Sequence, residues 1–133
     1  MHHILTNATE LLLLLFLIIT FLQSGLDKLM DWKGNLAWLK GHFAKSPLRD
    51  MVPLLLGIVL IMEMLVSIFC VVGLYLFLEH GKNDMALYGG MLACVCLLML
   101  LFGQRMAKDY EGAKTIAIYF VPAILLVFLL QEG

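Results

Sequence analysis

The amino-acid sequence predicts an all-α membrane protein, a bundle of four antiparallel transmembrane helices with an interfacial amphipathic helix between the first and second spans. The chain is 62% hydrophobic, with a mean hydropathy of +0.97, whereas soluble domains are about 45–50% apolar. Four apolar runs, at about 9–30, 51–78, 85–104 and 115–130, approach or exceed the ~17–25 residues that cross a bilayer as a helix. They lack the alternation that is typical of strands. Residues 1–133 are therefore expected to form one membrane domain.

Lys and Arg are distributed unevenly between the connections, which predicts the orientation of the bundle. Five cations lie around the first connection and three in the third, whereas the second carries Lys82 alone. The positive-inside rule places the two cation-rich connections in the cytoplasm. Both termini and the turn at residues 79–84 would then face outward. No Lys or Arg precedes the first apolar run, so we expect that run to remain as a span rather than to be removed as a signal peptide.

The first connection contains an amphipathic pattern. Apolar residues recur there at helical spacing, with the lysines away from them: Trp32, Leu36, Leu39 and Phe43. Such a stripe favours a helix that lies in the headgroup plane, with Trp32 and Trp38 as anchors. An irregular loop is the alternative.

Composition and spacing argue against several kinds of site. The net charge is −1, so no basic field would attract nucleic acid. The cysteines lie in apolar runs without a Cys-x-x-Cys pair, which favours buried thiols: Cys70, Cys94 and Cys96. No grouping of His, Cys and Asp has metal-ligand spacing. The histidines are expected to be solvated residues outside the spans: His2, His3, His42 and His80.

Small residues predict where the spans approach one another closely. Gly89 and Gly90 begin small-xxx-small pairs in the third run, and Gly57 and Gly73 lie in the second. Such residues allow helix backbones to come together in a membrane.

Glu63 is the most informative residue, because it lies inside the otherwise uncharged run 51–78. An acid at the centre of a span costs roughly 2.5–3.5 kcal/mol on insertion scales. Glu63 therefore needs a counter-charge or a proton. Lys28 and Arg105 are the cations near span ends that could reach it, and Tyr119 could add a hydrogen bond.

The polar residues of the spans and their ends gather in the predicted cytoplasmic half, which indicates a candidate site. Its members are Gln23, Asp27, Lys28, Glu63, Gln104, Arg105, Asp109 and Tyr110. Three interpretations remain open: a clamp that sets the register of the helices, a pocket for a quinone or a lipid headgroup, and an interface to a partner subunit. No residue is assigned a catalytic role.

Three short motifs carry a resemblance to a known family. Gly25 and Lys28 end the first span, Glu63 lies in the second, and Gly103 and Arg105 end the third. With the segments 21–29 and 102–110 and the intervening Trp32…Pro47 region, this pattern resembles the DoxX family of small four-helix bacterial membrane proteins, in particular members from Bacteroidetes-type bacteria.

The resemblance implies a location in the bacterial inner membrane, where the uneven distribution of cations makes both termini periplasmic. It also implies an accessory subunit of a quinone-linked or thiol-redox membrane complex, with a partner protein that supplies electrons and quinone as a candidate cofactor, since the chain encodes none. Two alternatives stay open: a carrier for a lipid or small amphiphile, and a scaffold without its own ligand. Whether the chain is an enzyme or a homo-oligomer is also left open.

Overall fold

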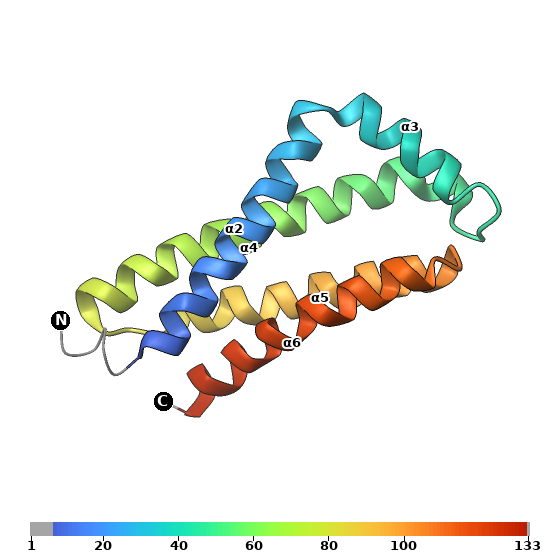
Figure 1. The fold of residues 1–133 in the computed structure, drawn as a ribbon. Coiled ribbons are helices and arrows are strands. Elements are labelled where there is room, and N and C mark those ends of the chain that lie inside the picture. Colours follow the sequence, from blue (N-terminus) through green and yellow to red (C-terminus); the bar gives the residue numbers. More distant parts are fainter. Residues whose placement is uncertain (1–6, 133) are drawn as a thin grey trace.

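The computed structural model describes residues 7–132, which form four long helices and one shorter helix (Figure 1). The long helices are α2 (Ala8–Met30), α4 (Val52–His80), α5 (Asp84–Met106) and α6 (Tyr110–Glu132). Each is long and apolar enough to cross a membrane. The predicted all-α bundle of four spans is thus confirmed. The expectation for His2 and His3 falls outside the described residues.

Local signals determine where the helices begin and end. The α4 helix stops at Gly81, whose φ of 66° favours glycine. The α6 helix begins at Tyr110, earlier than the expected residue 115. The reason is Asp109, whose Oδ1 accepts a hydrogen bond from Gly112 N at 2.9 Å and so satisfies a free N–H group of the first turn.

The four long helices run up and down, with short turns between α4 and α5 and between α5 and α6 (Figure 1). The start of α2, the α4–α5 turn and the end of α6 lie at one end of the bundle. In the core, α4 packs against both α2 and α5, and α5 packs against α6. The largest fully buried side chains come from α2, α4, α5 and α6: Phe21, Leu14, Leu17, Leu126, Val66, Cys70 and Cys96.

Two glycines sit where α4 and α5 are closest. A Cβ atom at Gly73 would lie 2.5 Å from Ala86 N, and one at Gly89 would lie 2.8 Å from Cys70 Sγ. The prediction of close contacts was wrong for Gly57, where a Cβ atom would meet only the Trp32 ring, at 3.9 Å. Glycine is therefore needed at residue 73 to let the backbones approach.

The first connection contains a helix, α3 (Trp32–His42), followed by the 3₁₀ turn η1 (Arg49–Met51). The helix begins after Asp31, whose side chain accepts from Gly34 N at 3.2 Å. The predicted apolar stripe is half-buried, whereas Lys33 and Lys40 are exposed. Figure 1 shows α3 and the following loop at the end of the bundle opposite the α4–α5 turn. The amphipathic helix is therefore present, and its apolar face is turned toward the bundle.

Candidate functional site

Glu63 forms an ion pair with Lys28, across the contact between α4 and α2. Glu63 is only 3% exposed, and Lys28 Nζ lies 2.9 Å from Glu63 Oε1. The geometry at Oε1 is that of a charge contact and not of an aligned hydrogen bond. Of the two cations considered from the sequence, the structure thus brings Lys28 to the acid. A counter-charge at this distance offsets part of the cost of burying both groups.

Ser24 connects the two charged groups. Its hydroxyl accepts a hydrogen bond from Lys28 Nζ at 2.7 Å and donates one to Glu63 Oε2 at 2.7 Å. We refer to Ser24, Lys28 and Glu63 as the Glu63 triad. Sequence reasoning missed Ser24, although its position one turn before Lys28 places both side chains on one face of α2. A hydroxyl that donates to the acid and accepts from the amine fits an ionised pair.

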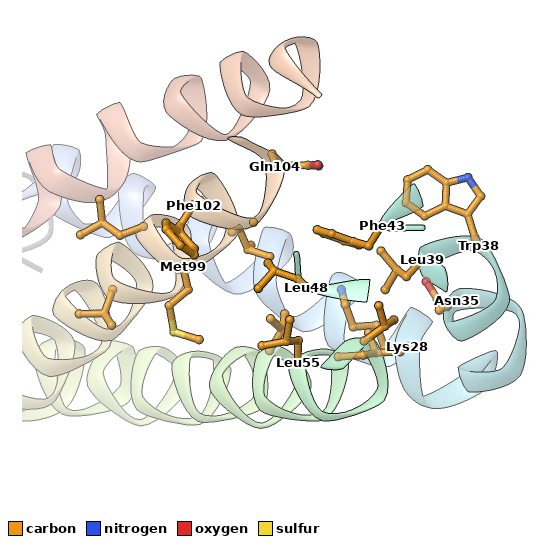
Figure 2. Close-up of a pocket in the computed structure, with 17 residues that line it drawn as sticks. Lys28, Asn35, Trp38, Leu39, Phe43, Leu48, Leu55, Met99, Phe102 and Gln104 are labelled. Carbon is orange, nitrogen blue, oxygen red and sulfur yellow. The ribbon is translucent and has the colours of Figure 1, made fainter. Parts of the chain in front are cut away.

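A cavity of about 610 Å³ lies next to the triad. Its wall consists of α3, the following loop, the first part of α4 and the last part of α5, and Lys28 reaches it from the end of α2 (Figure 2). Among the described residues that line it, Lys28 is the only one with a charged side chain, and most others are apolar. Figure 2 shows Leu39, Phe43, Leu48 and Leu55 around the Lys28 nitrogen. The triad therefore presents one polar group, the Lys28 ammonium, to a cavity whose wall is mostly apolar.

A second polar group, which we call the rim cluster, joins α3 to the α5–α6 turn: His42, Gln104 and Asp109. His42 Nε2 lies 2.8 Å from Gln104 Oε1 and 3.5 Å from Asp109 Oδ2. The expectation that His42 is a solvated loop residue was wrong. It is the last residue of α3, its side chain is only 15% exposed, and its ring stacks on Trp38.

The rim cluster could not be found from local spacing, because His42 and Gln104 are 62 positions apart. They meet only because α3 folds back toward the end of α5. His80 is exposed, as expected, but it is the last residue of α4 rather than part of a loop.

The remaining predicted site residues lie apart from the triad. Gln23 and Asp27 are exposed on α2. Arg105 is also exposed, and its guanidinium lies 5.2 Å from the centre of the Tyr110 ring. Tyr119 packs against Phe16 and not against the acid. The structure thus divides the predicted cluster of eight into Lys28 with Glu63, Gln104 with Asp109, and four residues on the exposed surface.

The fold defines the class of protein: a multi-pass integral membrane protein with four apolar helices, an internal ion pair and an adjacent apolar cavity. Comparison with protein-family models, with curated proteins and with solved structures finds no match for this chain.

Proposed function

We propose that this protein binds an amphiphile within the membrane, with the polar end of the ligand near Lys28 and its apolar part in the cavity. The observation that carries the proposal is the cavity itself. Its volume of about 610 Å³ falls within the ~300–1,000 Å³ of small-molecule sites, which combine apolar walls with a few placed polar groups. Lys28, Asn35 and Gln104 are the polar or charged members of the described wall besides Trp38.

The contacts of these polar groups support a role for Lys28 in orienting the ligand. Asn35 Nδ2 donates to Asp31 O at 2.8 Å, and Gln104 Oε1 is engaged by His42. Lys28 is held by Ser24 and Glu63, so its ammonium is fixed in place before a ligand arrives. A fixed donor orients a ligand without a further cost in side-chain entropy.

We further propose that the chain is a DoxX-like subunit of a bacterial inner membrane, with both termini periplasmic. The support is the motif made by Gly25, Lys28, Glu63, Gly103 and Arg105 together with the uneven distribution of cations. In this setting a quinone is one candidate ligand, because a quinone carbonyl would accept a hydrogen bond from Lys28. A partner subunit would then supply the electrons.

A scaffold without a ligand is the second candidate function. The observation that favours it is the ion pair, which connects α2 to α4. A clamp of this kind would stabilise the bundle whether or not the cavity is filled. The two candidate functions differ in one respect: a binding protein holds an amphiphile in the cavity, whereas a scaffold needs no ligand there.

The test compares two neighbouring leucines of α4. Leu55 lines the cavity, whereas Leu54 is 62% exposed and is not part of the wall. Native mass spectrometry of protein released from detergent should show a bound amphiphile in the unsubstituted protein and in Leu54→Trp, but much less in Leu55→Trp. Equal occupancy in both variants, or no bound amphiphile after incubation with lipid extract and quinone, would favour the scaffold.

A further inference from the structure

The charge of the cavity wall narrows the class of ligand, and this step rests on the proposed function. We infer that the cavity accepts an uncharged amphiphile whose head is a hydrogen-bond acceptor, such as a carbonyl, ester or hydroxyl, and that it rejects anionic amphiphiles such as fatty acids. The basis is the position of Glu63, which does not line the cavity but forms an ion pair with Lys28 and so neutralises its charge.

Glu63 neutralises the charge of Lys28 within the protein, so a ligand does not need to carry a negative charge to balance it. Lys28 is the only charged residue in the described wall, and the Glu63 carboxylate lies 2.9 Å from its ammonium. A carboxylate on the ligand would have to compete with Glu63 for the same cation. Whichever carboxylate lost this competition would be buried without a partner, which is strongly unfavourable in apolar surroundings.

The ammonium can still donate to a neutral acceptor. It has three N–H groups. One meets Ser24 Oγ at 2.7 Å, and the contact to Ser24 O, at 3.5 Å, is long. A second points toward Glu63 Oε1, at 2.9 Å. The third N–H group has only the long contact to Ser24 O, and Lys28 lines the cavity (Figure 2), so this group can donate to the head of a ligand.

The other polar wall residues do not change the balance of charge. Asn35 and Gln104 are neutral amides, and each is engaged in a hydrogen bond outside the cavity, to Asp31 and to His42 respectively. The selection between neutral and anionic heads thus depends on the ion pair between Lys28 and Glu63.

A matched pair of ligands tests the inference: hexadecanoic acid and its methyl ester, which share one chain and differ in charge. Binding is measured by native mass spectrometry and by competition in detergent at about pH 9, where a carboxylic acid is ionised. The ester is expected to bind at least about tenfold more tightly, a difference that corresponds to ~1.4 kcal/mol. Tighter binding of the acid by the unsubstituted protein would overturn the inference while leaving the proposed function intact.

Glu63→Gln supplies the second arm, because it leaves Lys28 without its counter-charge. The ratio of the two affinities should then shift toward the acid. Ser67→Ala is the control: Ser67 Oγ donates to Glu63 O at 2.9 Å, so this change alters a neighbour without altering charge, and the ratio should stay the same. An unchanged ratio in Glu63→Gln would contradict the role of Glu63. If that variant does not fold, the ligand pair on the unsubstituted protein decides. Saturable binding of neither ligand would instead refute the proposed function.

Discussion

Lys28 and Glu63 form an ion pair between two membrane-spanning helices, with 2.9 Å between Nζ and Oε1 and with Ser24 bonded to both side chains. The pair lies beside an apolar cavity, so the same two residues affect the stability of the bundle and the charge that a ligand meets. These two effects can be separated by experiment. The stability of the bundle depends on whether a buried group loses its partner, whereas the selectivity of the cavity for ligands depends on the net charge of Lys28 and Glu63 together.

Lys28→Met should destabilise the protein by about 3–5 kcal/mol, because it leaves the buried Glu63 carboxylate without a counter-charge. Adding Glu63→Met should restore most of the loss, since two apolar side chains replace the pair. Equilibrium unfolding in detergent measures both effects. Lys33→Met, at an exposed position of α3, is the matched control and should change little. If the double variant lost the sum of both single effects, the coupling between the two residues would be refuted.

Gly73→Ala should destabilise the contact between α4 and α5 by about 1–3 kcal/mol, the usual cost of an overpacked site. Its Cβ atom would lie 2.5 Å from Ala86 N, and backbone cannot move aside as a flexible side chain can. Gly57→Ala is the control on the same helix, because the nearest atom there is 3.9 Å away. Thermal unfolding of the two variants should therefore differ clearly. Equal stability of the two variants would contradict a close backbone contact between α4 and α5 at Gly73.

His42→Ala should loosen the end of α3 from the rest of the bundle. It removes the 2.8 Å contact to Gln104, worth about 1 kcal/mol for a typical hydrogen bond. Amide hydrogen exchange over α3 should then become about fivefold faster, since local opening is governed by local free energy. Lys40→Ala, an exposed change on the same helix, should leave the exchange rate unchanged. Equal acceleration in both variants would show that the rim cluster does not hold α3.

The proposed orientation predicts opposite accessibility for two connections. Lys82→Cys, in the turn between α4 and α5, should react with a membrane-impermeant maleimide from the periplasmic side. Lys45→Cys, after α3, should react only once the membrane is permeabilised. The native thiols are buried, so background labelling should be low. The reverse pattern would invert the orientation, and labelling of both from one side would contradict the four-span topology.

The four spans could be predicted because a helix that crosses lipid has to be long and apolar, and both properties are local. The amphipathic helix in the first connection was predictable for the same reason, since its stripe repeats at helical spacing. The start of α6 was predicted too late, because hydropathy does not register the Asp109 cap. The presence of a partner for Glu63 was also expected, because a buried acid alone is costly.

Hydropathy and charge along the chain were enough to predict the membrane-spanning fold and to show that Glu63 needs a counter-charge or a proton. The packing of the helices determines that Lys28 is the cation that meets the acid, that Ser24 bonds to both, and that His42 contacts Gln104. Hydropathy and helical periodicity are properties of neighbouring residues, whereas an ion pair or a cavity depends on how separate helices are placed. The cavity is the clearest case, because its wall combines α3 and the following loop with the first part of α4 and the last part of α5.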